Sequence, residues 1–197
     1  MPEQDANLDP KIVQIVNQYR QIAAAYGELF GEIYKRTEYE EWRMDGIGSC
    51  RIPTHNSLAG IDGIAKDAII QLREQVSESD TSERVELAEG AAMCRYHRAG
   101  KGCVLTDLKS PMCISHIESR DEVAGKFGIE QMDFAMDVFK ALRKVMWTKV
   151  SDLSAVNPDE NNQFVSNTVV DIHALILRVV QVPEIDPARR IKFIPSE

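Results

Sequence analysis

Helical periodicity is the feature that most constrains the fold of this 197-residue chain. Between residues 12 and 33, apolar side chains recur at steps of three and four residues, which places them along one face of an α-helix. Asp9 is a favoured N-cap, and Pro10 is favoured at the first helical position. We therefore expect the first helix to begin at Pro10 and to extend to about Glu41.

Four further segments show the same periodicity, and each has a recognisable start or end. Asn56 or Ser57 can cap a second helix, and Ser82 can cap a short third one. A capping box at residues 119–122 introduces a helical turn before the fourth helix, and Pro183 ends the last helix. No pair of strands is convincing, so the sequence predicts an all-α, five-helix globular domain. The expected helices cover residues 10–41, 57–76, 82–94, 129–146 and 164–182.

The charge and hydropathy of the chain disfavour some classes of protein. The formal net charge of −8 and the isoelectric point near 5.1 argue against binding to a nucleic-acid backbone, which requires a clustered basic surface. Residues 1–9 do not resemble a secretory signal, and no apolar run approaches the roughly 18 residues that a membrane span needs. We therefore expect a cytoplasmic protein without a membrane segment. A reducing cytosol disfavours disulfides, so the four cysteines are expected to be ligands, catalysts or core residues.

Three cysteines are concentrated in a segment that lacks helical periodicity. Cys94, Cys103 and Cys113 have eight and nine residues between them, and they belong to an expected irregular loop at residues 95–117. A loop of this length usually has a function or an internal support, and a bound metal would supply that support. Cys50 lies upstream in a glycine-containing loop.

The spacing of the cysteines favours an iron–sulfur cluster over zinc. Thiolates suit both kinds of centre, but structural zinc sites usually take their ligands from short C-x2–4-C knuckles, which the sequence lacks. Wider spacings are compatible with a [4Fe–4S] cluster, which needs four thiolates in total. A redox-active thiol pair, or cysteines that only pack in the core, are the other interpretations. We therefore predict one [4Fe–4S] cluster, with Zn²⁺ as the alternative, and the predicted ligands are Cys50, Cys94, Cys103 and Cys113.

Other residues near the cysteines could complete or tune such a centre. His55, His97 or His116 could replace Cys50 and give a Cys3His site, because imidazole is a good zinc ligand. Each of these histidines could instead be an ordinary surface residue. Two glycines before Cys103 would let backbone amides approach a cluster. Positive charge would lower the pKa of the thiols and offset an anionic centre, and it is supplied by Arg95, Arg98, Lys101 and Lys109.

The segment from Cys94 to Cys113 resembles the cysteine core of the YkgJ-type family of zinc- or iron-chelating proteins. The step Gly102-Cys103-Val104-Leu105, followed by a basic residue and a proline ahead of the last cysteine, is similar to the pattern of that family. The similarity covers these 20 of the 197 residues. The chain departs from the family in having only Cys50 upstream, where the family usually has a clustered pair, and in placing Pro111 one position later. The resemblance implies metal binding and no particular substrate.

These features predict a single helical metal-binding domain at residues 1–182 and an extended C-terminal tail at residues 183–197. The cysteine-rich metal-binding loop would lie between helices three and four. The expected function is electron transfer, redox sensing or an accessory role in a larger system. The alternative is a structural zinc-binding adaptor whose tail and first helix bind a protein partner, and a third hypothesis is an enzyme with an open metal position. The apolar stripes of the first and last helices could also form a homodimer.

Overall fold

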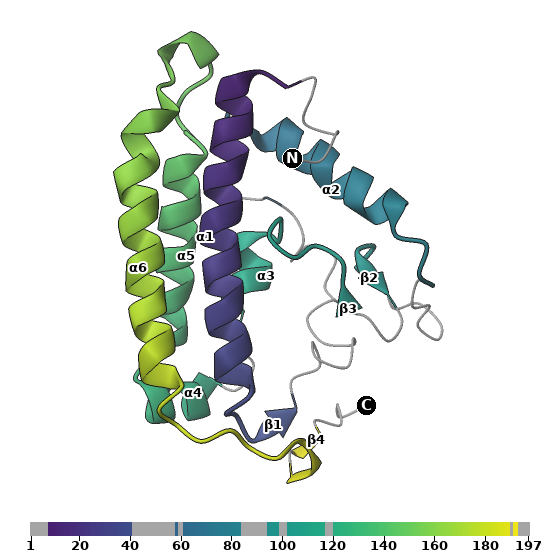
Figure 1. Cartoon of the computed structure of the whole chain (residues 1–197), viewed down its shortest axis with the longest axis vertical. Helices are drawn as coiled ribbons and strands as arrows, with labels where there is room; N and C mark the ends of the chain where they lie inside the picture. Colours follow the sequence, from purple (N-terminus) through teal and green to yellow (C-terminus); the bar gives the residue numbers. More distant parts are fainter. Residues whose placement is uncertain are drawn as a thin grey trace.

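The computed structural model describes residues 8–40, 58, 61–83, 94–98, 102–116, 120–189 and 191–192. The described part of the chain is mostly helical, which confirms the predicted fold class at that level (Figure 1). No helix in this part is long and apolar enough to cross a membrane. The α-helices are α1 (Pro10–Tyr34), α2 (Lys66–Ser79), α3 (Pro111–Ser115), α4 (Arg120–Phe127), α5 (Gln131–Val145) and α6 (Asn162–Val179).

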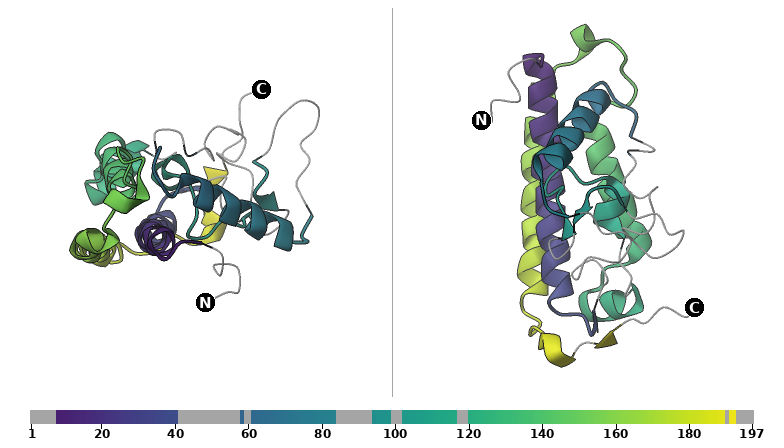
Figure 2. Two further views of the ribbon diagram at one scale, coloured as in Figure 1. Left: turned by 90° about the horizontal axis from the view of Figure 1, so that it is seen from above. Right: turned by 90° about the vertical axis from the view of Figure 1, so that its right-hand side faces the viewer.

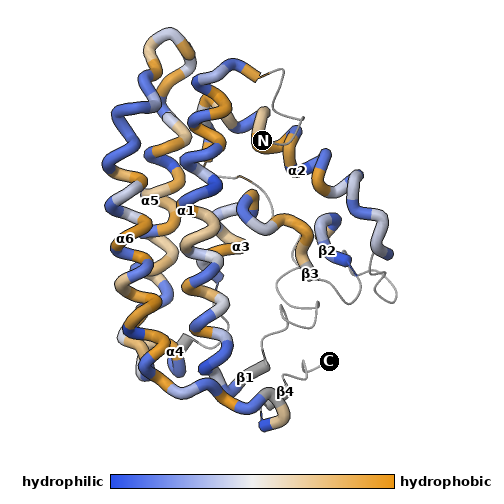
Figure 3. The backbone as a smooth tube through the Cα atoms, viewed as in Figure 1, coloured by the Kyte–Doolittle hydropathy of each residue, from blue (hydrophilic) through white to orange (hydrophobic). Residues whose placement is uncertain are grey.

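Three of these helices, α1, α5 and α6, run side by side and form the main core (Figures 1 and 2). Seen from above in Figure 2, α1 has α5 and α6 on one side and α2 on the other. On α1, Ile15, Ile22 and Leu29 recur at seven-residue steps and are fully buried. Along the tube in Figure 3, apolar and polar positions alternate on the helices, as amphipathic packing requires.

The start of α1 agrees with the sequence prediction, whereas its end does not. The Asp9 side chain accepts a hydrogen bond from the Lys11 N–H at 2.8 Å, and Pro10 lies in the first turn. The helix ends at Tyr34, so the predicted extension towards Glu41 is wrong. The apolar pattern itself stops at Ile33, next to the observed end of the helix.

The chain after α1 pairs with the C-terminal segment. Strand β1 (Tyr39–Glu40) pairs in parallel with β4 (Ile191–Lys192). Just before β4, the Ile185 N–H donates to the Lys35 carbonyl oxygen at 2.9 Å, and a short 3-10 helix follows at Pro187–Arg189. The described part of the predicted tail therefore lies against the end of α1.

The second predicted helix begins later than expected. α2 starts at Lys66, and the predicted caps Asn56 and Ser57 lie outside the described residues. Leu58 and Ile61 precede the helix but are buried, with 3% and 0% exposure. These two residues are therefore apolar because they are buried in the core, and their spacing does not indicate a helix.

Two glycines have conformational roles that a side chain would disturb. An added Cβ atom at Gly63 would lie 2.0 Å from the Met146 carbonyl oxygen, so the segment that leads into α2 can approach the end of α5 only without a side chain there. Gly128 has a φ of 65° and ends α4 by donating its N–H to the Ala124 carbonyl oxygen at 2.9 Å.

Residues 94–116, named here the cysteine segment, contain regular structure that the sequence did not reveal. Strands β2 (His97–Arg98) and β3 (Gly102–Cys103) form an antiparallel hairpin. Helix α3 follows, and the Ser110 side chain accepts a hydrogen bond from the Cys113 N–H at 3.2 Å. The prediction of an irregular loop is therefore wrong here, because elements this short do not show periodicity.

The last two predicted helices are confirmed as α5 and α6, with ends that differ by up to three residues. The expected polar loop between them contains two 3-10 turns, Leu153–Ala155 and Pro158–Asn161. The helical turn expected before the fourth helix is α4. Its predicted cap Ser119, and residues 84–93 of the predicted third helix, lie outside the described part of the chain.

Candidate metal centre

Three of the predicted ligands, Cys94, Cys103 and Cys113, lie in one region of the structure. Cys94 precedes β2 and is 6% exposed, whereas Cys103 in β3 and Cys113 in α3 are half-buried. In the described part of the chain, none of the three takes part in a disulfide. Cys94 is buried in a small apolar cluster with Tyr96 and Leu105, against which Cys103 also packs.

The pKa of the Cys103 thiol depends on its burial and on the charged groups around it. Burial has the largest effect and raises the pKa above its ordinary value, while the Lys109 ammonium and a hydrogen bond with the Leu105 backbone lower it. Negative charge on Cys113 and on Cys94 raises it further. A free Cys103 thiol therefore keeps its proton at neutral pH, and a bound metal cation would favour the thiolate.

Arg98 attaches the hairpin to the end of α2. Its side chain is 1% exposed, and its guanidinium donates to the Ser77 carbonyl oxygen at 2.7 Å and to Ser77 Oγ at 3.0 Å. It also donates to the Arg95 carbonyl oxygen at 2.9 Å and lies 3.7 Å from the Asp80 carboxylate. Because the last carbonyl groups of a helix attract cations, this position at the end of α2 stabilises a buried guanidinium.

Tyr96 makes a second attachment between the hairpin and α2. The guanidinium groups of Arg73 and Arg95 each lie 5.0 Å from the centroid of its ring. Its hydroxyl donates to the Glu74 carboxylate at 2.7 Å, and Arg95 also pairs with Glu74. Together with Arg98, these contacts fix the orientation of the hairpin that carries Cys103.

The rest of the cysteine segment is attached to α1 and α5. The hydroxyl of Tyr19 in α1 donates to the Lys109 carbonyl oxygen at 2.6 Å, and the amide of Gln131 in α5 donates to the Ser115 carbonyl oxygen. Burial raises the pKa of Tyr19, and Cys113 is close enough to raise it further. Three helices therefore hold the segment that carries the thiols.

His97 lies beside these thiols and is almost fully buried. Its exposed fraction is 2%, and neither ring nitrogen has a hydrogen-bond partner within the described part of the chain. In the β2–β3 hairpin His97 is paired directly with Cys103. Burial lowers the pKa of His97, and the Arg98 charge lowers it further, so the imidazole is neutral at neutral pH. His116, the other histidine considered in this segment, is half-buried.

The predicted ligand set is only partly described. Cys50, His55 and Lys101 lie outside the described residues. Within the described ranges, no group of three or more Cys, His, Asp and Glu side chains is arranged to hold a metal ion. The structure thus gathers three thiols in one region without a complete coordination sphere.

The arginines make attachments that the sequence did not indicate. The guanidinium groups of Arg95 and Arg98 bind α2, and an effect of their charge on a metal centre stays a prediction. Lys109 is the predicted cation that lowers the pKa of Cys103. The attachments made by Arg98, Tyr96 and Tyr19 had no signal in the sequence, because each joins residues that are distant along the chain.

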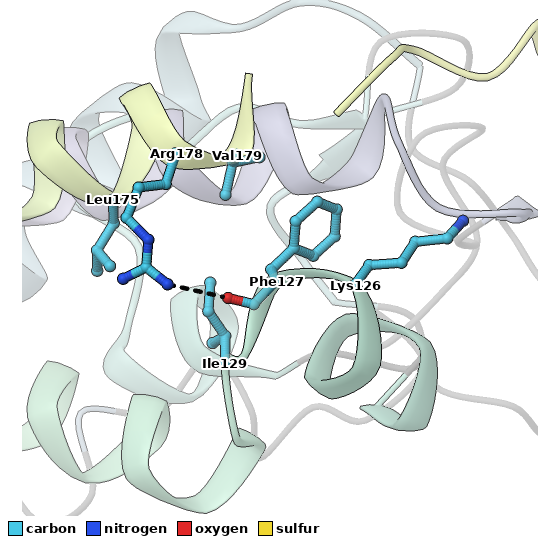
Figure 4. A pocket seen from close by; sticks show the side chains of 6 residues that line it. All are labelled: Lys126, Phe127, Ile129, Leu175, Arg178 and Val179. Atoms are coloured by element: carbon cyan, nitrogen blue, oxygen red, sulfur yellow. Dashed lines mark hydrogen bonds between the residues drawn. The ribbon is translucent and has the colours of Figure 1, made fainter. Parts of the chain in front are cut away.

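A separate pocket lies between α4 and α6 (Figure 4). Its volume is about 100 Å³, which is room for only a few water molecules. Arg178 donates to the Phe127 carbonyl oxygen at 3.5 Å, and Lys126 pairs with Glu122 at 2.6 Å. The pocket has no buried polar group that would fix a ligand, so the cysteine segment is the stronger candidate site.

A comparison with protein-family models, curated proteins and solved structures finds no match to this chain.

Proposed function

We propose that the protein binds a metal centre through Cys94, Cys103 and Cys113, and that this centre is a [4Fe–4S] cluster. The observation that carries the proposal is the packing of Cys103 against the buried cluster that contains Cys94, within a segment of 20 residues that also carries Cys113. Cysteines that only pack in a core have no reason to gather from a turn, a strand and a helix. Cys50 is the fourth ligand that the sequence predicts.

The donor set fits this group in its chemistry. Thiolates are the usual ligands of iron–sulfur clusters, and Lys109 supplies a positive charge close to Cys103. The attachments of Arg98 and Tyr96 to α2 would hold the ligand backbone in place when the centre changes charge. When bound, the cluster would supply one-electron exchange, which suits electron transfer, redox sensing or an accessory role beside a protein partner.

Structural zinc is the second candidate, and the closed setting of the thiols favours it. Cys94 is 6% exposed, and the cysteine segment contacts α1, α2 and α5. A closed tetrahedral zinc site joins sequence-distant elements in this way and contributes folding free energy. The protein would then be an adaptor whose metal has no redox role.

Metal analysis of protein purified without oxygen separates the two candidates. About four iron atoms per chain, with visible absorbance that bleaches on reduction, are expected for a [4Fe–4S] cluster. About one zinc per chain in a colourless sample is expected for the adaptor. Protein that holds neither metal, and does not take up either on reconstitution, would contradict both candidates.

Substitution of one thiol gives a direct test of the site. Cys103→Ala should abolish metal binding and lower the melting temperature, because it removes a ligand from the centre of the segment. Thr106→Ala is a matched control, since Thr106 is exposed in the same segment. Full metal content in Cys103→Ala, measured by elemental analysis, would exclude Cys103 as a ligand.

A further inference from the structure

We propose that His97, in place of Cys50, is the fourth ligand of the metal centre, and this inference rests on the function proposed above. The centre would then take the donors Cys94, His97, Cys103 and Cys113, all from one segment of 20 residues.

The burial of His97 is the first observation behind this assignment. His97 is only 2% exposed, and neither of its ring nitrogens has a hydrogen-bond partner within the described residues. Buried polar atoms in proteins almost always have a partner, and a core histidine that served only packing would normally donate or accept at least one hydrogen bond. A metal bound at one nitrogen would give this imidazole its missing interaction.

The register of the hairpin places His97 on the same face as Cys103. His97 and Cys103 are directly opposite in the ladder, so their side chains leave the same face. The next pair along the hairpin, Tyr96 and Val104, is hydrogen-bonded, since the Val104 N–H donates to the Tyr96 carbonyl oxygen at 2.9 Å. Hydrogen-bonded and non-hydrogen-bonded pairs alternate along an antiparallel ladder. His97 and Cys103 therefore form the closer, non-hydrogen-bonded kind of pair, with Cβ atoms roughly 4.5–5.5 Å apart. Cys103 in turn packs against the cluster that contains Cys94.

The spacing of Cys94 and His97 supplies a third observation. Two residues separate them, and the His97 N–H donates to the Cys94 carbonyl oxygen at 2.9 Å, which closes a tight turn. Two ligands separated by two residues in such a turn have the spacing of the knuckles that bind metal in structural zinc sites. Imidazole is also known as a ligand of iron in iron–sulfur centres, so the assignment holds for either metal.

Arg98 holds in place the strand that carries His97. It follows His97 in β2, and its four hydrogen bonds to Ser77, Arg95 and the His97 carbonyl oxygen hold the strand on α2. The backbone of His97 is thereby held beside Cys103 before any metal binds, and metal binding would then require the four donor side chains to close together, since no three of them are arranged to hold a metal in the described structure.

The test compares full-length variants His97→Ala, Cys50→Ala and His97→Cys with the wild-type protein. Metal affinity is measured by competition with a chelator, using zinc or iron according to the native content. Loss of a residue that only supports a ligand typically weakens binding by about 10–100-fold, so loss of a true ligand should exceed about 100-fold. We expect that loss for His97→Ala, wild-type-like affinity for Cys50→Ala, and retained metal for His97→Cys. His173→Ala is the matched control, because His173 is exposed on α6.

Spectroscopy of the wild-type protein keeps the test independent of folding defects. X-ray absorption at the zinc edge, or pulsed electron paramagnetic resonance of a reduced iron centre, should detect an imidazole nitrogen that disappears in His97→Cys. A sulfur-only coordination shell, together with metal loss in Cys50→Ala, would overturn the assignment of His97 while leaving the metal centre intact. Wild-type protein that binds neither metal would overturn both proposals. If His97→Ala and Cys50→Ala both lose metal, the wild-type spectrum decides: nitrogen in the shell supports His97, and sulfur alone rejects it.

Discussion

Two adjacent residues of β2, His97 and Arg98, are both buried but differ in how their polar atoms are satisfied. The Arg98 guanidinium is 1% exposed and donates hydrogen bonds to Ser77 and to backbone carbonyl groups of the hairpin. Neither ring nitrogen of His97 has a partner in the described part of the chain. The Arg98 Nε also lacks a hydrogen-bond partner, but the other guanidinium nitrogens are satisfied, whereas the His97 ring has no partner at all among the described residues.

A second residue, Tyr26 of α1, makes the stability of the protein fall with rising pH in the alkaline range. Burial raises its pKa to about 12, and the carboxylates of Asp137 and Asp171 contribute further. In the unfolded chain a tyrosine loses its proton near pH 10, roughly two units earlier. The contribution of Tyr26 to the free energy of unfolding is therefore complete below pH ~10. It is lost as the pH rises towards about 12, and the loss is about 1.4 kcal/mol per pH unit.

Urea unfolding at a series of alkaline pH values measures this loss. Tyr26→Phe should flatten part of the decline, because phenylalanine has no proton to lose. An equally steep decline in wild type and Tyr26→Phe would show that the Tyr26 phenol is not a source of the pH dependence. Tyr19, whose pKa burial also raises, accounts for some of the decline that remains.

At the scale of elements, the close approach at Gly63 holds the start of α2 against the end of α5. Gly63→Ala should lower the free energy of unfolding by about 3 kcal/mol, because its Cβ would lie 2.0 Å from a backbone oxygen that cannot rotate away. Gly31→Ala is the matched control, since a Cβ there meets no atom within 4 Å. In the interior of α1 it should raise stability by about 0.5–1 kcal/mol. Equal melting temperatures for the two variants would contradict the close approach.

The sequence predicted those elements whose signals are local. Asp9 and Pro10 fixed the start of α1, and long apolar stripes located α5 and α6. The end of α1 was missed because it depends on the pairing of β1 with β4, whose residues lie far apart in the sequence. The hairpin and α3 were missed because they are too short to show a period.

The sequence predicted which residues make up the candidate site, but it did not predict the contacts that hold this segment on the rest of the fold. Three cysteines in 20 residues were enough to mark the segment, and the structure brings their thiols into one region. No pattern in the sequence could show that Arg98 binds the end of α2 or that His97 lacks a hydrogen-bond partner. Both facts depend on neighbours that only the fold supplies. Cys50 as a ligand stays a prediction.

At the scale of the whole molecule, the bundle and the cysteine segment should differ in their response to metal removal. Helices α5 and α6 pack with α1 along its length (Figures 1 and 2), whereas the cysteine segment and α2 share fewer core residues with it. A chelator should therefore increase amide hydrogen exchange at residues 94–98 and 102–116, and in α2, while α5 and α6 keep their protection.

Hydrogen exchange followed by mass spectrometry, with and without the chelator, gives this comparison peptide by peptide. The Cys103→Ala protein is the reference for a chain that cannot bind metal, and its exchange should match that of the chelated wild type. Uniform loss of protection across all helices would show that the metal supports the whole fold. Unchanged hydrogen exchange in all peptides would show that the metal centre has no structural role.

The position of α1 in the bundle also affects how the chain folds as it leaves the ribosome. α1 is synthesised before α6, which covers one of its apolar faces and begins about 130 residues after Tyr34. At about 5–20 residues per second, the nascent chain carries this uncovered face for on the order of 10 seconds. The bundle therefore closes only after α6 has been synthesised, and a chain that stops before α6 would expose a long apolar surface to chaperones and to other nascent chains.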